Sequence, residues 1–443
     1  MKLLADVTPL RASAAYRRFW AGTTLSTIGG SLTYFAVTLQ VYEITRSPVA
    51  VGLIGLATMV PLLTVGLLGG TLIDRLDRRR LVLACTSCAM AVSAALTAQA
   101  FLGLRAVWPL YLLFALASAA GAVNAPARRT LITGMLPAAQ LPAALALDQL
   151  TIQVTLTAGP ALAGVIVAAP HLGLGGCYLI DTASFAAALY GAARLPRGSA
   201  PVSAVPQTRL AAVAAGVSFI RRSPVLYGAF LADLNATFFG LPISLFPAIN
   251  AARFGGDPRT LGLLTTAIGV GGLISAVFSG PVKHLSRQGL GMLVSVSIWG
   301  TAFAVFAVAG SLWLTLLALG VAGAADAGTV VLRGIIVQTF TPEEFRGRVT
   351  AADYVVGAGG GQLGSLEAGA VGSVTSPVIS ALSGGLLTVA GAVAIGALLP
   401  AFRRYRAGAT APVMTRAPSP GQSVSGAGPG ADSGTEHLAD VEP

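Results

Sequence analysis

The sequence contains few charged residues, few cysteines and few histidines for its length. Charged residues make up 10% of the 443 residues, whereas a soluble domain carries roughly 25%, so a soluble globular protein is excluded. Three cysteines are too few for a disulfide scaffold. The three histidines are too scattered along the chain to indicate a metal site. No P-loop sequence for ATP is present either, so we expect no cofactor and no metal.

Hydrophobic residues and glycine are abundant instead. Hydrophobic residues make up 54% of the chain, and 54 residues are glycine. Glycine within long apolar runs suits closely packed membrane helices, and each spanning helix needs about 20 residues. The sequence therefore predicts an all-α membrane protein with twelve transmembrane helices in two pseudo-symmetric six-helix bundles. The expected spans are residues 19–41, 49–73, 81–102, 107–123, 145–168, 174–193, 225–249, 261–282, 290–308, 312–337, 349–371 and 377–399.

A long polar break between the sixth and seventh spans divides the chain into two halves. We expect an N-terminal bundle over residues 1–194, a cytoplasmic linker over 195–224, a C-terminal bundle over 225–406 and a cytoplasmic tail over 407–443. Within the linker, Leu210 to Ile220 has the pattern of an amphipathic helix on the membrane surface. The tail is rich in Gly, Pro, Ser and Ala and cannot bury a core, so it is expected to be disordered.

The basic residues predict the orientation of the chain in the membrane. If the N-terminus is cytoplasmic, the outer connections hold only four of the 28 Lys and Arg residues, as the positive-inside rule requires. Both termini are therefore expected in the cytoplasm, and the chain is expected to cross the cytoplasmic membrane of a bacterium many times. The net charge of +11 then follows from topology and does not indicate a nucleic-acid partner.

The loop between the second and third spans carries the most specific motif. Residues 70–80 read G-T-L-I-D-R-L-D-R-R-R. This resembles the signature loop of the major facilitator superfamily, which has glycine where this chain has Asp77. In that superfamily the loop aspartate latches the two halves, so the resemblance implies that Asp74 docks near the partially positive start of the eleventh helix. The alternative is a loop that only sets topology. The implied latch residues are Gly70, Asp74, Arg75, Asp77, Arg78 and Arg79.

The D-R-x-D-R-R form of this loop is similar to a branch of bacterial exporters that includes enterobactin and macrolide exporters. Residues 45–48, 126–129 and 345–349 also look like recurrent loops of that branch, and the resemblance covers about residues 16–405. It implies a secondary active transporter and not an enzyme. Such a protein would export a hydrophobic or amphiphilic small molecule, such as a drug, macrolide or siderophore, by proton antiport with alternating access.

Other functions stay open at this point. Uptake of a small solute by symport or uniport is the first alternative, because sequence does not set the direction of transport. A non-transporting membrane sensor is the second. For the transport function, the expected partners are a small-molecule substrate, protons and the lipid bilayer, and the protein is expected to be a monomer.

The fifth span contains the sequence G-P-A-L-A-G, which comprises Gly159, Pro160 and Gly164. Proline removes a backbone hydrogen bond and kinks a helix, while glycine permits close approach of a neighbouring helix. The sequence resembles in part the Gly-Pro antiporter motif of proton-coupled exporters. Helix packing alone is the alternative explanation.

Acidic residues inside the spans are candidate proton sites, because a charge near the bilayer centre costs at least about 2.5–3.5 kcal/mol. Asp233 and Asp326 lie nearest the middle of their spans and are the first candidates for proton coupling. Asp181 and Glu367 are the second. Desolvation favours the protonated form of a carboxylate, which would allow proton exchange. The alternative is a structural role, such as a salt bridge between Asp326 and Arg333, roughly two helical turns apart.

Two further acids, Asp148 and Asp353, lie close to expected helix ends. We expect them to cap a helix or to pair with a nearby arginine, for example Arg128 or Arg348.

The substrate cavity is expected to be apolar and aromatic, which suits a bulky amphiphile. An aromatic side chain in such helices is more often packed against lipid or a neighbouring helix, and this remains the alternative for each residue. The candidate lining residues are Tyr34, Phe35, Asn235, Phe238, Phe239 and Gln362.

Overall fold

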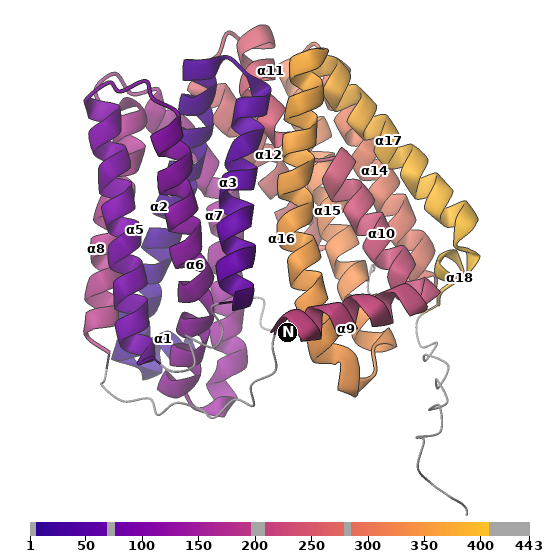
Figure 1. The fold of residues 1–443 in the computed structure, drawn as a ribbon, viewed down its shortest axis with the longest axis horizontal. Helices are drawn as coiled ribbons and strands as arrows, with labels where there is room; N and C mark the ends of the chain where they lie inside the picture. Colours follow the sequence, from indigo (N-terminus) through magenta and orange to yellow (C-terminus); the bar gives the residue numbers. More distant parts are fainter. Residues whose placement is uncertain (1–5, 69–75, 196–208, 279–284, 407–443) are drawn as a thin grey trace, which may run out of the picture. The chain divides into compact units, whose positions relative to one another are not determined.

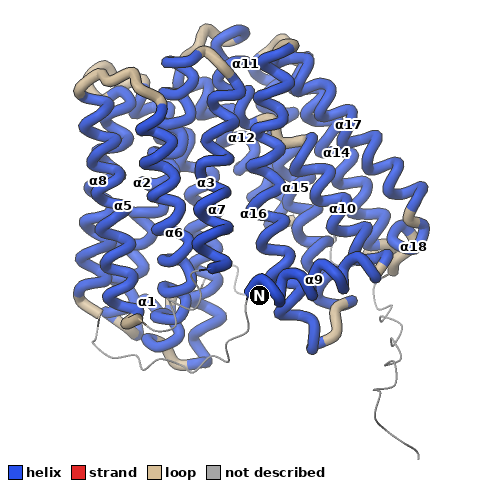
Figure 2. The backbone as a smooth tube through the Cα atoms, in the orientation of Figure 1, coloured by secondary structure: helices blue, strands red, loops and turns tan. Residues whose placement is uncertain are grey.

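The computed structural model describes residues 6–68, 76–195, 209–278 and 285–406. Within these ranges every regular element is a helix and no strand is present (Figure 2). A helix satisfies its backbone hydrogen bonds within its own segment, as an apolar environment requires. The all-α fold class predicted from the sequence is therefore confirmed.

The helices of the described residues follow the twelve expected spans, six in each half of the chain. The seventh span is interrupted, because Gly240 and Pro242 separate α10 from η2 and α11. The first half consists of α1 (Thr8–Ala12), α2 (Ala14–Thr45), α3 (Pro48–Leu68), α5 (Arg78–Phe101), α6 (Trp108–Met135), η1 (Ala138–Gln140), α7 (Leu141–Val167) and α8 (Gly173–Ala193). The second half consists of α9 (Arg209–Arg222), α10 (Pro224–Phe239), η2 (Ile243–Leu245), α11 (Phe246–Arg253), α12 (Pro258–Val277), α14 (Gln288–Val308), α15 (Leu312–Phe340), α16 (Glu343–Val374), α17 (Pro377–Leu398) and α18 (Pro400–Arg403).

Nine helical segments of the described chain are long and apolar enough to cross a membrane. The helices α2, α8 and α16 are also long enough, but they contain more glycine, hydroxyl and charged residues. Two of these three, α2 and α8, pack against each other along buried faces. Contact with a neighbouring helix lets a membrane helix carry such small and polar residues.

Short polar side chains begin six of the helices. In each case the residue before the first helical turn accepts a hydrogen bond from a backbone N–H group that has no partner within the helix, which stabilises the helix start. These residues are Ser13, Asp77, Ser223, Asp257, Ser311 and Ser376.

The helix α6 ends later than the sequence predicts. The expected span stops at residue 123, whereas α6 continues through Pro126 to Met135. Proline kinks a helix without always ending it. As a result, Arg128 lies inside the helix rather than in the loop that follows it.

The two ends of the membrane region can be named from the helices that lie there. In Figure 1, α1, α9 and α18 lie at one end, here called the α9 end, and α11 lies at the opposite end, here called the α11 end. Each half packs mainly with itself: α2 packs on α8, α3 and α5 pack on α6, α14 packs on α15 and α17, and α12 packs on α15. Between the halves, α3 packs against α16 and α7 packs against α12.

Glycine allows the two halves to approach closely. A Cβ atom added at Gly52 of α3 would lie 2.8 Å from the Cα atom of Leu366 in α16. One added at Gly262 of α12 would lie 2.6 Å from the carbonyl oxygen of Pro160 in α7. Since real Cβ contacts are longer than this, a larger residue at either position would push the helices apart.

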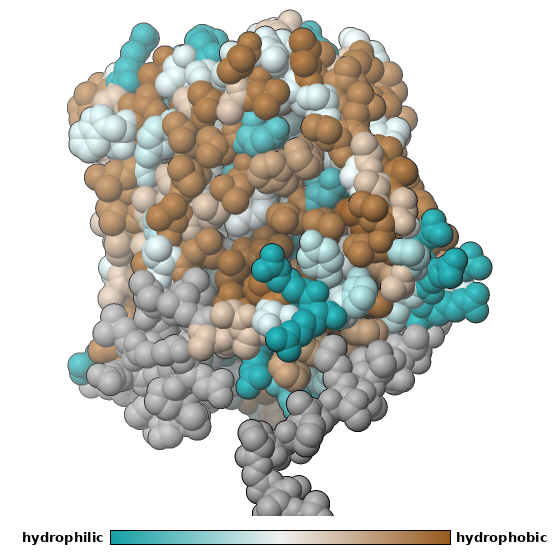
Figure 3. Space-filling model, turned by 45° about the vertical axis from the view of Figure 1, so that its right-hand side comes forward, coloured by the Kyte–Doolittle hydropathy of each residue, from teal (hydrophilic) through white to brown (hydrophobic). Residues whose placement is uncertain are grey.

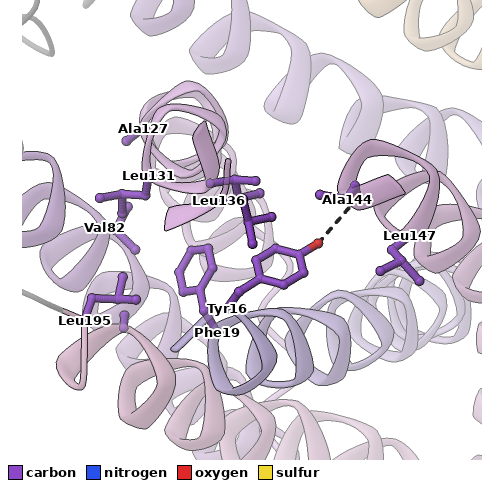
Figure 4. Close-up of a cluster of buried hydrophobic side chains, with 11 residues drawn as sticks. Tyr16, Phe19, Val82, Ala127, Leu131, Leu136, Ala144, Leu147 and Leu195 are labelled. Carbon is purple, nitrogen blue, oxygen red and sulfur yellow. Dashed lines mark hydrogen bonds between the residues drawn. The ribbon is translucent and has the colours of Figure 1, made fainter. Parts of the chain in front are cut away.

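A buried apolar cluster holds the first half together near the α9 end (Figure 4). Tyr16 and Phe19 of α2 lie at its centre, 0% and 3% exposed. The hydroxyl group of Tyr16 donates to the carbonyl oxygen of Ala144 in α7 at 3.5 Å. The cluster therefore joins α2 to α7, and through Leu131 it also joins α6.

On the face shown in Figure 3, the outward-facing side chains are mostly hydrophobic. Several large apolar side chains are well exposed, for example Trp313 at 84% and Val393 at 66%, as expected of helices that face lipid. Hydrophilic side chains gather toward the α9 end of the face in Figure 3. Exposed arginines of the helices at that end include Arg221, Arg222, Arg346, Arg403 and Arg404.

Candidate functional site

A buried arginine in the second half contacts two acidic residues from two other helices. Nη1 of Arg333 in α15 donates to Oδ2 of Asp233 in α10 at 2.7 Å. The same nitrogen lies 3.0 Å from Oδ1 of Asp353 in α16. The side chains of Arg333, Asp233 and Asp353 are 15%, 8% and 34% exposed. The arginine therefore ties three helices together at a place largely removed from solvent.

A third acid lies close to this group. Asp326 is on the same helix as Arg333 and lies within electrostatic range of Arg333 and Asp233. Its side chain is exposed, and it makes no hydrogen bond or ion pair with the described residues. We call Asp233, Asp326, Arg333 and Asp353 the acidic cluster. With three carboxylates and one guanidinium, the fully ionised cluster has a net charge of −2. It can therefore bind two protons before its net charge becomes positive.

The structure departs from the expected pairing at this site. The alternative salt bridge between Asp326 and Arg333 is not formed, and Asp353 contacts Arg333 rather than Arg348. The eleventh span expected from the sequence starts at residue 349, which predicts Asp353 close to a helix end. However, α16 begins at Glu343 rather than at residue 349, so Asp353 lies well inside the helix.

Asp181 of α8 lies in a separate polar site in the first half. It is 2% exposed. Its Oδ2 atom accepts hydrogen bonds from Oγ1 of Thr33 at 2.7 Å and from Oγ of Ser93 at 2.9 Å. The side chain also lines a cavity of about 280 Å³ whose walls include Phe114 and Phe185. Hydroxyl groups, and no basic side chain among the described residues, satisfy this carboxyl group.

Glu367, the fourth candidate for proton coupling, lies on α16 toward the α11 end. It is half-buried and makes no hydrogen bond or ion pair with the described residues. It is therefore not part of the acidic cluster.

Only part of the implied latch lies within the described residues. Gly70, Asp74 and Arg75 lie outside them. Asp77 is the N-cap of α5 and its Oδ1 atom accepts from the backbone N–H group of Arg80 at 2.9 Å. Arg78 and Arg79 form the first turn of α5. Arg79 donates to the carbonyl oxygens of Ala192 and Ala193 at the end of α8, so this residue joins two helices of the same half.

The Gly-Pro segment of the fifth span lies where α7 meets neighbouring helices. Gly159 faces the Ser31 side chain of α2. A Cβ atom added at Gly164 would lie 2.6 Å from the carbonyl oxygen of Pro258 at the start of α12. Pro160 lies inside α7. Gly159 thus packs within the first half, whereas Gly164 lies at the interface between the two halves.

The six candidate cavity residues differ in burial and in the residues that they contact. Phe35 is 5% exposed, and Asn235 is 9% exposed and donates to the carbonyl oxygen of Thr388 at 2.8 Å. Tyr34 is 37% exposed, and its ring lies 5.9 Å from that of Phe114. The others lie in the second half. Phe238 and Phe239 are partly buried, with their ring centroids 5.0 Å apart, and Gln362 of α16 contacts Gly55 of α3.

Curated relatives resemble the chain over nearly its whole length. The enterobactin exporter EntS of Citrobacter koseri is 27% identical over 406 residues, which cover 91% of this chain and 96% of that protein. The enterobactin exporter EntS of Escherichia coli is 26% identical over 419 residues, which cover 94% and 99%.

Solved transporter structures share the fold at low sequence identity. The nucleoside transporter NupG has a TM-score of 0.68 and 14% identity, with 89% of this chain and 100% of that chain covered. A bacterial homologue of the iron transporter ferroportin has a TM-score of 0.64 and 18% identity, with 88% and 99% covered. At this identity the likeness concerns the fold.

A family model described as transmembrane secretion effector matches residues 4–425, almost the whole chain. Together with the helical membrane fold, this match assigns the chain to transporters and not to enzymes. The chain belongs to the transmembrane secretion effector family of the major facilitator superfamily, and it is a multi-pass membrane transporter of the efflux type.

Proposed function

We propose that this protein exports a hydrophobic or amphiphilic small molecule across the bacterial cytoplasmic membrane in exchange for protons. The observation that carries the proposal is the acidic cluster, in which two carboxyl groups contact one largely buried guanidinium and a third lies within electrostatic range. The names of the curated relatives, which are enterobactin exporters, support a siderophore or a molecule of similar size and polarity as the substrate.

The acidic cluster suits proton exchange for an electrostatic reason. Ionised carboxylates that lie close together in a poorly solvated site repel one another, so the group favours binding a proton. Arg333 offsets part of this repulsion through its contacts with Asp233 and Asp353. Asp326 has no such contact among the described residues and is exposed to the surrounding space. Asp326 is therefore our first choice for the group that gains and loses the proton, with Asp233 as its electrostatic neighbour.

The packing between the halves supports alternating access. Along one face of α3, added Cβ atoms at Gly52 and Gly55 would lie 2.8 and 2.7 Å from atoms of α16. Further toward the α9 end, the Sδ atom of Met59 lies 3.7 Å from an added Cβ at Gly359. The tightest contacts between α3 and α16 thus lie toward the α11 end. With both termini in the cytoplasm, as we propose, this is a state closed toward the outside.

Three further parts of the proposal concern residues outside the acidic cluster. The signature loop, with Asp74 at its centre, would latch the halves together in the opposite state. An Asp74→Asn variant should then lose transport while still reaching the membrane, and unchanged transport would exclude the latch. Asp181 and Glu367 are secondary candidates for proton binding, and the segment at Gly159 and Pro160 would control the antiport by its packing between the halves.

The test is transport by purified protein in proteoliposomes under an imposed pH gradient. Enterobactin, macrolides and cationic dyes form the substrate panel. We expect at least one of these compounds to move against its own gradient and opposite to the protons. The Asp233→Asn/Asp326→Asn double variant should lose this coupling. Asp257→Asn is the matched control, since Asp257 is an exposed N-cap at the α11 end and asparagine caps a helix equally well.

Two results would contradict the proposal. Retained proton-driven transport in the double variant would exclude the acidic cluster as the proton site. Movement of substrate in the same direction as the protons would favour an uptake symporter.

A further inference from the structure

The acidic cluster has a counterpart in the first half of the chain. An arginine, a proline nine residues later and an aspartate eleven residues after the proline occur twice, at positions that differ by 205 throughout. The two sets are Arg128, Pro137 and Asp148 in the first half, and Arg333, Pro342 and Asp353 in the second.

The structure places the members of the two sets equivalently. Each arginine lies seven residues before the last residue of its helix, α6 or α15. Each proline is the N-cap of the helix that follows, with φ −58° and ψ 149° at Pro137 and φ −58° and ψ 151° at Pro342. Both aspartates lie in the next long helix, α7 or α16. Both arginines therefore lie toward the α9 end of their half, at matching depths.

The two arginines differ in their ion-pair partners. Arg333 contacts two carboxylates, whereas Arg128 makes no ion pair or hydrogen bond with the described residues, and its Nε atom is buried without a partner. One turn earlier on α6, the Oδ1 atom of Asn124 is also buried without a partner. Asp148 is close enough to interact electrostatically with Arg128 but not to form an ion pair. This part of the first half therefore has unused hydrogen-bonding groups.

The first helix of each half explains the difference. In the second half, α10 supplies Asp233 to the arginine. In the first half, the single acid of α2 is Glu43, close to the α11 end of that helix. Among the described residues, Arg128 and the neighbouring Arg129 thus face one carboxylate, that of Asp148, which leaves one positive charge in excess. The second half, with three carboxylates for one arginine, has the opposite excess.

We propose that Arg128 is a binding site for an anionic group of the exported molecule, and that Asp148 takes the place of this group when the molecule leaves. The inference deepens the proposed function and rests on it, since it names the substrate class as an anionic amphiphile. A guanidinium group binds a planar or tetrahedral anion with two parallel hydrogen bonds. The adjacent residue, Ala127, belongs to the buried apolar cluster, so apolar side chains lie close to Arg128.

The two halves would then have separate tasks. The first half, with its positive excess, binds the anionic group, and the acidic cluster in the second half exchanges protons. Asp148 stands where Asp353 stands beside Arg333, and a small shift of α7 toward α6 would bring it to Arg128. Pairing of Asp148 with Arg128 would weaken binding of the anion, because two negative groups would then share the donors of one guanidinium and repel each other.

The test is equilibrium binding to the purified full-length protein in a neutral detergent. The probes are 1-naphthoate, 1-naphthalenemethanol and 1-naphthylmethylamine, which share one ring system and differ in charge. We expect naphthoate to bind about 10- to 100-fold more tightly than the other two, as expected for hydrogen bonds to a charged group. Arg128→Gln should remove this preference, and Arg128→Lys should keep part of it. Arg222→Gln is the matched control, since Arg222 is exposed on α9 at the same end of the membrane region and should leave the preference unchanged.

Asp148→Asn separates a binding role from a merely structural one. Removal of the competing carboxylate should tighten naphthoate binding, whereas a variant that only disturbs folding would weaken binding of all three probes. Phosphatidylglycerol added to the micelles distinguishes a lipid headgroup from a soluble anion as the ligand. If the lipid displaces naphthoate at equimolar amounts, the site belongs to lipid and the proposal is overturned.

The proposal is also overturned if the wild-type protein shows no preference for naphthoate, or if Arg128→Gln keeps it. The binding experiment uses no proton gradient, so its result does not depend on whether the protein is a proton antiporter. Naphthoate binding that depends on Arg128, together with an absence of proton-driven transport, would leave the anion site in place and refute only the antiport.

Discussion

Replacement of Gly164 by alanine is expected to weaken the contact between α7 and α12, and thus between the two halves. The added Cβ atom would lie 2.6 Å from the carbonyl oxygen of Pro258 and 3.2 Å from the Cα atom of Arg259. Both are backbone atoms at the start of α12, so a side-chain rotation cannot relieve the overlap. To restore an ordinary contact, the helices must move apart by roughly 0.5–1 Å, which forfeits a quarter to a half of the dispersion energy across the contact.

The expected cost is about 1–3 kcal/mol, the usual range for overpacking. This cost applies to the state described here, in which α7 and α12 are in contact. A state in which they are apart pays nothing for the extra methyl group. The population ratio of the two states should therefore shift by a factor of about 5–150 in favour of separation at the α11 end.

Double electron–electron resonance between spin labels at Val165 and Leu263 measures this shift. Both side chains are exposed, at 58% and 43%, and lie on α7 and α12. The native cysteines would be replaced by alanine. Gly121→Ala is the matched control, because it adds the same methyl group to a helix where an added Cβ meets no atom within 4 Å. We expect a longer distance in Gly164→Ala only, and equal distance distributions in the two variants would refute the argument.

Two further predictions concern stability. Asp233→Asn and Arg333→Gln should each destabilise the protein. The double variant should be less destabilised than the sum of the two by about 0.5–3 kcal/mol, because the two side chains share one buried contact. Thermal unfolding of the wild type and the three variants measures this difference, and strict additivity would exclude the coupling. Asp77→Ala should lower the free energy of unfolding by about 1 kcal/mol, because α5 loses its N-cap. Asp77→Asn keeps a capping side chain and should not lower it. Equal melting temperatures of the two variants would contradict the capping role.

The membrane helices could be predicted well from the sequence, because long apolar runs have few other uses. Their ends were harder to predict. Pro126 ends the apolar pattern, yet α6 continues to Met135 because its residues beyond the proline pack in the buried apolar cluster with α2 and α5. Similarly, the polar start of α16 from Glu343 onwards has no apolar signal, although it is helical. Tertiary packing and capping determine these ends, and neither is visible in a hydropathy pattern.

The members of the acidic cluster could be predicted only in part. Asp233 and Asp326 stood out because of their depth in the membrane, and the structure places both near Arg333. The contact of Arg333 with Asp353 depends on how α15 and α16 are rotated about their axes. The apolar pattern does not determine this rotation, because both helices are hydrophobic on most sides. The repeated spacing from arginine to aspartate was the signal that could have revealed Asp353 as a partner.

The helix α16 has a mechanical consequence, because it is attached at both ends to different parts of the molecule. At its start, the ring of Phe345 stacks on Phe219 of α9 with centroids 4.5 Å apart. Near its end, the Oγ atom of Ser373 accepts from the backbone N–H group of Val49 in the other half at 3.1 Å. A helix of 32 residues is about 48 Å long, so a tilt of roughly 10° about its middle moves each end by about 4 Å. A displacement of α9 at one side of the bilayer would therefore tilt α16 and change its contact with Val49 at the other side.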